Sequence, residues 1–128
     1  MERSTDELQR SLLISRLFLD IARAFRGVDW PNENYGMHAA DGMLVAAVFI
    51  GETEGRPMNA SKLAEFVGVP RPTVIRRMAE LARNGRVVKD GTVWRYAGPR
   101  DIEGTRRATA AAVKAIIRTA EQLSRLDT

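Results

Sequence analysis

Four side chains suited to contacting nucleic acid fall within the segment 71–77: Arg71, Thr73, Arg76 and Arg77. A guanidinium group can donate to O6 and N7 of one guanine at once, and a threonine methyl can contact the methyl of thymine. Both residue types also bind phosphate. In this pattern Arg71, Thr73 and Arg76 are the expected base readers, whereas Arg77 is suited either to reading a base or to binding phosphate.

A helix over about 71–84 is predicted to present these side chains. Pro70 and Pro72 stand at its start, where the missing N–H of proline is tolerated. Asn84 and Gly85 end it. An α-helix fits the major groove of B-DNA, and the residues near its N-terminus reach the base edges. The first two turns of this helix are therefore the expected reading surface.

A shorter helix is predicted just before it, over 60–67. Asn59 is a good N-cap for this helix, and Gly68 supplies a turn in which a left-handed backbone costs nothing. Two helices joined in this way form a helix-turn-helix. Lys62 and the amide end of the shorter helix are the expected phosphate contacts, which set register rather than sequence.

A β-hairpin is predicted directly after the helix-turn-helix. Asp90-Gly91 stands between two runs of β-branched and aromatic residues, which is the strongest short-range signal for a two-residue hairpin turn. A turn at these residues pairs Lys89 with Thr92, Val88 with Val93, Val87 with Trp94 and Arg86 with Arg95. The sequence leaves open which face of the hairpin meets the helices. A hairpin in this position is the wing of a winged helix-turn-helix.

Positive charge is concentrated in the same segment. Between Arg56 and Gly98 there are nine basic and three acidic residues, a net charge of +6, whereas the remainder has 11 basic and 13 acidic residues, a net charge of −2. Lys89 and Arg95 place part of this charge on the wing, where they are expected to contact phosphate or the minor groove. Arg83 and Arg86 are suited equally to DNA contact and to stabilising the helix C-terminus. The asymmetry is typical of a nucleic-acid surface, although charge alone is equally compatible with a solvated basic face.

The two ends of the chain are predicted to be long helices, over about 5–26 and 102–126, the second starting at about Ile102 or Thr105. Thr5 or Asp6 can cap the first, whose apolar residues cover so wide an arc that one neighbouring helix cannot bury them all. A second chain is a candidate for covering the rest. The last helix is amphipathic, with an apolar row at three- and four-residue spacing: Thr109, Val113, Ile116, Ala120 and Leu123.

The middle of the chain is predicted to hold a connector over 28–41 and a buried central helix over 42–54. Asp41 is the expected cap of that helix. Four large or polar side chains of the connector are expected mainly to pack on the helices: Trp30, Tyr35, Met37 and His38.

The run LAEFVGVPRPTVIRRMAELARNGRVV at 63–88 resembles the winged helix-turn-helix of bacterial transcription regulators. The order of elements along the chain resembles the MarR family. The resemblance implies a mainly α fold with a small β-hairpin, in which the N- and C-terminal helices join two chains into a homodimer. It also implies a repressor that reads a palindromic operator, sometimes relieved by a small-molecule effector. The four connector side chains are the candidates for lining an effector pocket.

The expected organisation is one domain over 1–128, with dimerisation helices at 5–26 and 102–126 and a DNA-binding segment at 56–98. Pro70 and Pro72 depart from the family pattern, in which Ser or Thr often caps the recognition helix. The short wing is a second departure. Base reading should therefore rest mainly on the helix at about 71–84.

Other function classes find less support in the sequence. The chain has no Cys and one His, and it has no Gly-rich phosphate loop or Ser/His/Asp set, so we expect neither an enzyme nor a cofactor or metal site. The apolar run at 43–50 is too short to span a bilayer, and a cytoplasmic protein is expected. The main alternative is a winged helix that binds a protein partner without sequence-specific DNA binding, which Ile75 alone among the residues of 71–77 favours.

Overall fold

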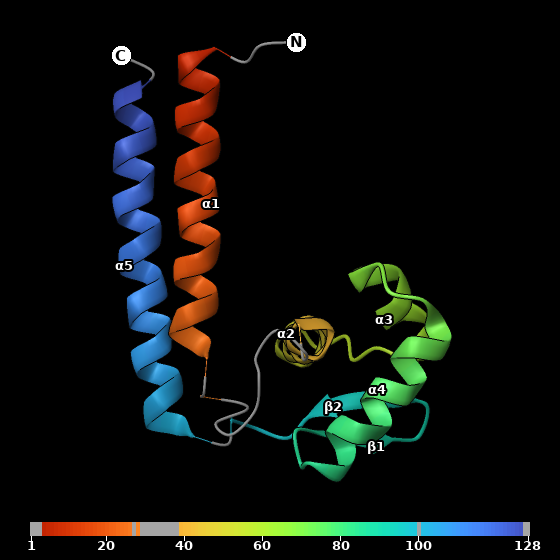
Figure 1. The fold of residues 1–128 in the computed structure, drawn as a ribbon. Helices are drawn as coiled ribbons and strands as arrows, with labels where there is room; N and C mark the ends of the chain where they lie inside the picture. Colours follow the sequence, from red (N-terminus) through yellow and green to blue (C-terminus); the bar gives the residue numbers. More distant parts are fainter. Residues whose placement is uncertain (1–3, 27, 29–38, 100, 127–128) are drawn as a thin grey trace. The chain divides into compact units, whose positions relative to one another are not determined.

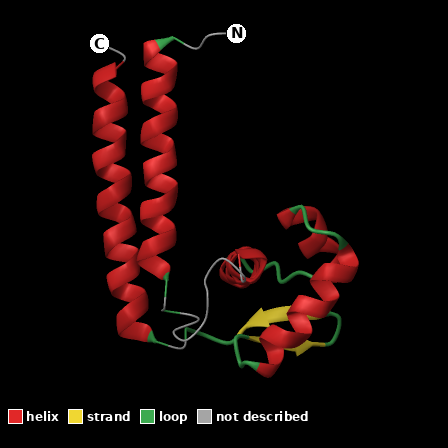
Figure 2. Ribbon diagram, viewed as in Figure 1, coloured by secondary structure: helices red, strands yellow, loops and turns green. Residues whose placement is uncertain are grey.

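The structure is a computed structural model that describes residues 4–26, 28, 39–99 and 101–126. The described residues form five helices and one antiparallel hairpin, which confirms the predicted fold class, mainly α with the layout of a winged helix-turn-helix (Figures 1 and 2). In chain order the elements are α1 (Thr5–Phe25), α2 (Ala39–Thr53), α3 (Ala60–Val67), α4 (Arg71–Arg83), β1 (Val87–Asp90), β2 (Val93–Tyr96) and α5 (Ile102–Leu126).

The chain divides into two compact units. Unit 1 consists of Met1–Glu33 and Asp101–Thr128, and unit 2 is Asn34–Arg100. Helices α1 and α5 belong to unit 1, and all other elements belong to unit 2. The two terminal helices, which lie far apart in the sequence, therefore form one unit, and the central helix α2 joins the helix-turn-helix and the wing in the other.

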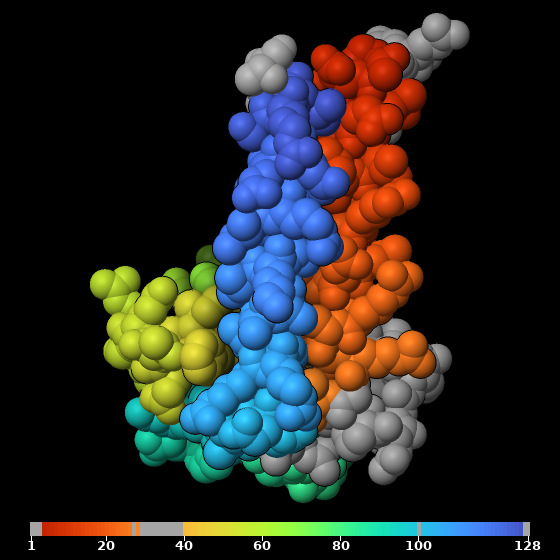
Figure 3. Space-filling model, turned by 90° about the vertical axis from the view of Figure 1, so that its left-hand side faces the viewer, coloured from red at the N-terminus to blue at the C-terminus, as the bar shows by residue number. Residues whose placement is uncertain are grey.

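Helices α1 and α5 of unit 1 run side by side in opposite directions along their length (Figures 1 and 3). The predicted caps of α1 were wrong by one or two positions, because Ser4 caps it. Ser4 Oγ accepts from the backbone N–H of Glu7 at 3.1 Å, and Glu7 Oε2 accepts from the N–H of Ser4 at 3.0 Å. This reciprocal pair satisfies two N–H groups that the helix itself leaves open.

The face that α5 buries is a row of small residues: Gly104, Ala108, Ala112, Ala115 and Thr119. Small side chains let two helix backbones approach closely. The larger apolar row predicted for α5 lies on a neighbouring face, and its Val113 and Ile116 are exposed in the single chain. The amphipathic pattern was correct, but the face buried within the chain is the one made of small residues.

Unit 1 leaves much of its apolar surface uncovered. No residue of α1 is buried, and Phe18 is 72% exposed. Large apolar side chains are exposed on both helices: Leu8, Leu12, Ile14, Phe18 and Leu19 on α1, and Ile102, Val113, Ile116 and Ile117 on α5. Large exposed apolar surface is typical of protein–protein interfaces.

Unit 2 has a conventional core. Helices α2, α3 and α4 each contribute fully buried side chains, among them Leu44, Leu63 and Met78. The hairpin closes the core with Val87 and Trp94. The backbone N–H of Trp94 donates to the carbonyl of Met58 at 2.9 Å, so the link before α3 lies against β2.

Helix α2 begins three residues before its predicted start at Gly42. Asp41 therefore is not its cap but a residue of its first turn, and it is 3% exposed. A carboxylate near a helix N-terminus is stabilised by the helix dipole. The predicted connector side chains Trp30, Tyr35, Met37 and His38 lie outside the described residues, so the structure does not bear on their roles.

The hairpin forms where predicted, but each residue of β1 pairs with a residue two positions later than predicted. Its cross-strand pairs are Val87 with Tyr96, Val88 with Arg95, Lys89 with Trp94 and Asp90 with Val93. The two-residue turn is therefore Gly91-Thr92 and not Asp90-Gly91. Gly91 has φ +63°, and no described non-glycine residue has positive φ. A two-residue turn with positive φ only at its first position is type II′, whereas Asp90-Gly91 in type I′ would need positive φ at both.

Candidate nucleic-acid interface

The turn between α3 and α4 forms as the sequence predicts. Asn59 caps α3, with its Oδ1 accepting from the N–H of Lys62 at 2.8 Å, and Gly68 adopts the left-handed conformation at φ +81°. Helix α4 has no side-chain cap, and Pro70 stands at the cap position with Pro72 in the first turn. The amides at the start of α4 that no side chain caps can serve as donors to an anion.

Helix α4 has an inner face, an exposed face and two flanks. The inner face is the buried row Val74, Met78 and Leu81. At about 100° per residue, the opposite and exposed face carries Pro72, Arg76, Ala79 and Arg83. Arg76 makes no hydrogen bond or ion pair with any described residue. Of the four sites predicted on this helix, Arg76 is the one at the centre of the exposed face.

Arg71 and Ile75 lie together on the flank of α4 that faces α3. Arg71 Nε donates to Ser61 Oγ of α3 at 2.9 Å, and the rest of its guanidinium stays exposed. The bond to Ser61 fixes the direction of the side chain. Ile75 follows one turn later and is also exposed. The α3 flank therefore combines a charged donor and an aliphatic group.

Thr73 and Arg77 lie on the opposite flank. Arg77 Nε is 3.6 Å from Oδ1 of the buried Asp41, and its Nη1 is 3.2 Å from Oε2 of Glu80. Thr73, one turn before Arg77, is half-buried. The charge of Arg77 is therefore already matched within unit 2, which makes it poorly suited to be the phosphate clamp that the sequence allowed.

Lys62 is exposed on the first turn of α3, and its side chain makes no ion pair with a described residue. It is available to bind an anion, in keeping with the predicted phosphate role. Helix α3 carries one acidic residue, Glu65, on its later half.

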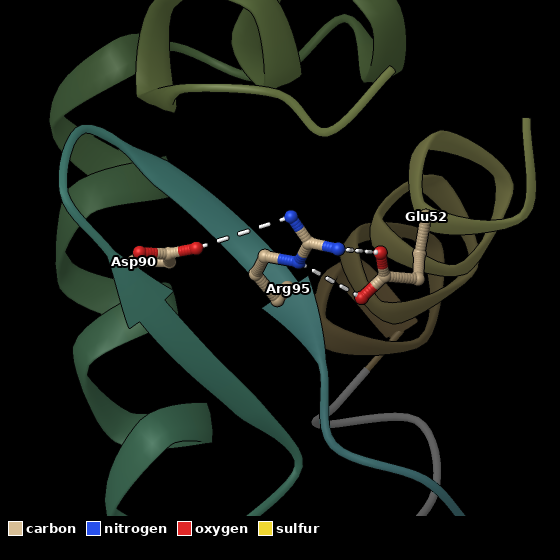
Figure 4. Close-up of polar contacts among 3 residues, drawn as sticks. All are labelled: Glu52, Asp90 and Arg95. Atoms are coloured by element: carbon tan, nitrogen blue, oxygen red, sulfur yellow. Dashed lines mark hydrogen bonds and ion pairs between the residues drawn. The ribbon is translucent and has the colours of Figure 1, made fainter. Parts of the chain in front are cut away.

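Arg95 of the wing has an internal partner that the sequence did not reveal. Its Nε and Nη2 donate to the two carboxylate oxygens of Glu52 in α2 at 3.2 and 2.6 Å, and its Nη1 is 3.9 Å from Asp90 Oδ2 (Figure 4). A two-pronged arginine–carboxylate pair of this kind is strong and directional. Arg95 therefore tethers the wing to α2 instead of offering a free charge.

Lys89 is the remaining wing cation among the predicted sites. Its Nζ lies 5.7 Å from the centroid of the Trp94 ring, within the range of a cation–π interaction. The side chain is exposed, so the ammonium group can still bind phosphate. With Arg95 paired and Asp90 beside the turn, the wing offers little free positive charge.

Arg83 and Arg86, which are not among the predicted contact residues, lie in different environments. Arg83 is exposed and lies two turns after Arg76 on the same face of α4. Arg86, for which the sequence allowed DNA contact, is 3% exposed, so it belongs to the interior of unit 2. The helical period that links Arg76 and Arg83 was the sequence signal that could have placed Arg83 on the same face as Arg76.

Within the described ranges, no three His, Asp or Glu side chains cluster closely enough to hold a metal ion. No helix in those ranges is both long and apolar enough to cross a bilayer.

Comparison with known proteins gives a structural likeness. No protein-family model matches the chain, and no curated protein sequence matches it. The chain is similar to the crystal structure of RV1404 from Mycobacterium tuberculosis, with a TM-score of 0.57 at 23% sequence identity. The match covers 95% of this chain and 82% of that one. At this identity the likeness establishes the fold alone.

Proposed function

We propose that this protein is a transcriptional regulator that binds double-stranded DNA sequence-specifically, as a homodimer, in the bacterial cytoplasm. In this proposal α4 enters the major groove of a palindromic operator, and the protein acts as a repressor. The observation that carries the proposal is the exposed face of α4, on which Arg76 and Arg83 lie two turns apart with Ala79 between them.

Three features support this use of α4. The helix stands second in a helix-turn-helix, the position from which such motifs read the major groove. Pro72 and Ala79, the neighbours of Arg76 on the exposed face, are short, so that the helix can approach base edges closely. The segment around it holds a net charge of +6, which favours a polyanion.

The proposed division of labour among the cations follows from their partners. Arg76 reads a base, with Arg71 beside it, and Lys62, Arg83 and Lys89 bind phosphate. Arg77 and Arg95 are not proposed as contacts, because Asp41, Glu80 and Glu52 already pair with them.

The exposed apolar surface of unit 1 supports the homodimer. Burying a Phe or Ile side chain contributes about 1.5–3 kcal/mol, and each copy would bury several. A palindromic operator is the DNA counterpart of a two-fold symmetric dimer.

Selection of bound duplexes from a random pool tests the proposal. The expected result is a two-fold symmetric consensus whose binding weakens steeply as salt is added, because phosphate contacts release counterions. Arg76→Ala should lose about 1–3 kcal/mol of preference for one base pair per half-site while nonspecific binding survives. Equal loss of specific and nonspecific binding would reduce Arg76 to a phosphate contact.

One observation favours a second candidate, a winged helix that binds a protein partner. Phe66, Ile75 and Val88 are exposed large apolar residues of unit 2. Binding to duplexes that shows no consensus and no salt dependence would favour this alternative over DNA recognition.

A further inference from the structure

Ile75 is the large apolar side chain on the exposed part of α4. It is 46% exposed, whereas Val74, which precedes it, is fully buried. Single exposed apolar residues are common on protein surfaces and need no function. The position of Ile75 is unusual because of its neighbours, since Arg71 lies one turn before it on the same flank and Arg76 follows it directly in the sequence.

We propose that Ile75 is a specificity-determining residue that recognises the C5 methyl group of a thymine in the major groove. This inference rests on the proposed function and adds to it one base of the operator. It also predicts where that base lies, next to the bases read by the arginines.

The chemistry selects thymine among the four bases. In the major groove, guanine, adenine and cytosine present hydrogen-bond donors and acceptors, and thymine also presents a methyl group. The side chain of Ile75 has neither donor nor acceptor, so it cannot bind phosphate or the polar edge of a base. A cytosine at the same position has no C5 methyl group, so Ile75 would lose the apolar contact that thymine offers.

The geometry places the thymine within one or two base steps of the arginine-read bases. Residues four apart on a helix have Cβ atoms about 5–6 Å from each other. Successive bases of one strand are about 3.4 Å apart along the duplex axis. Ile75 is therefore within reach of a base neighbouring the one that Arg71 contacts. Ile75 also lies in the second turn of α4, which is the part of the helix expected to reach base edges.

The test replaces thymine by deoxyuridine, which removes only the methyl group. In the consensus duplex, each thymine of one half-site is replaced in turn, and affinity is measured for the wild-type protein and for Ile75→Ala. One replacement should weaken the wild type about four-fold, the equivalent of one buried methyl group. The same replacement should change the affinity of Ile75→Ala less than about two-fold, because the partner of the methyl is gone.

Val88→Ala is the matched control, because Val88 is also an exposed aliphatic residue of unit 2 but lies on the wing. It should keep the sensitivity of the wild type to the methyl group. Circular dichroism of both variants checks that they are folded, as expected for substitutions at exposed positions.

The outcomes separate this inference from the proposed function. A consensus in which no thymine depends on its methyl, or in which Ile75→Ala keeps the full dependence, would overturn the role of Ile75 and leave sequence-specific binding in place. A pool that yields no consensus for the wild-type protein would instead overturn the proposed function itself, and this inference with it.

Discussion

Units 1 and 2 of this chain differ in which apolar side chains they bury. Unit 2 encloses large apolar side chains such as Leu44 and Leu63, and its helix α4 exposes Arg76 and Arg83. Unit 1 buries a row of small residues between two long helices and leaves residues such as Phe18 and Ile116 exposed. Unit 2 thus has a core of large side chains within one chain, whereas unit 1 leaves large apolar side chains on both of its helices exposed.

The difference between the units matches the division of function in our proposal. A two-helix unit has too few neighbours to cover two wide apolar arcs, so a second copy is the simplest way to cover them. A unit with a complete core can present a charged helix rigidly. Rigid presentation matters because reading a base edge requires donors at fixed positions.

Truncating one leucine in each unit should give the largest contrast. Leu44→Ala removes a side chain with no exposed surface and should lower the free energy of unfolding by about 2–5 kcal/mol at any protein concentration. Leu12→Ala, on the exposed face of α1, should cost little when the protein is dilute and more when it is concentrated, because only the proposed dimer would bury that face. Urea unfolding at two protein concentrations makes the comparison. A cost for Leu12→Ala that does not vary with concentration would contradict the interpretation of unit 1.

A charge on the exposed face of α1 should separate the proposed dimer. Phe18→Asp loses an apolar contact worth about 1.5–3 kcal/mol and buries a carboxylate, so the dissociation constant should rise by at least about ten-fold. Sedimentation equilibrium measures this change. Ile75→Asp is the control, because it places the same charge on an exposed aliphatic position of unit 2 and should leave self-association unchanged. If Phe18→Asp associates as tightly as the wild type, the dimer does not use this face.

The smallest expected effect is that of Arg77→Ala, which tests whether Arg77 positions α4 or contacts DNA. Arg77→Ala removes the guanidinium beside the buried carboxylate of Asp41 and should lower the free energy of unfolding by about 1–2 kcal/mol. Its DNA binding should keep the salt dependence of the wild type. Arg83→Ala should instead leave stability unchanged and reduce the slope of log affinity against log salt by about one. A reduced slope for Arg77→Ala would return Arg77 to the set of phosphate contacts.

The sequence by itself determined the elements whose signals are local. Asn59 and Gly68 fix the ends of α3 through a side-chain cap and a left-handed backbone, and neither depends on distant residues. The apolar period of α4 likewise gave its buried face. The two long helices were found by the same kind of pattern, and the hairpin was found from its turn glycine.

Only the tertiary structure decided the rest, because the deciding contacts join residues far apart in the chain. Asp41 of α2 pairs with Arg77, and Glu52 of α2 pairs with Arg95. Two of the seven predicted contact residues therefore have their charge matched inside unit 2. The local signal at residues 90 and 91 did not distinguish a type I′ from a type II′ turn, and the register observed in the folded unit has Trp94 buried and hydrogen-bonded to Met58. Sequence patterns show which residues carry charge, but packing decides which of these charges have a partner inside the folded chain.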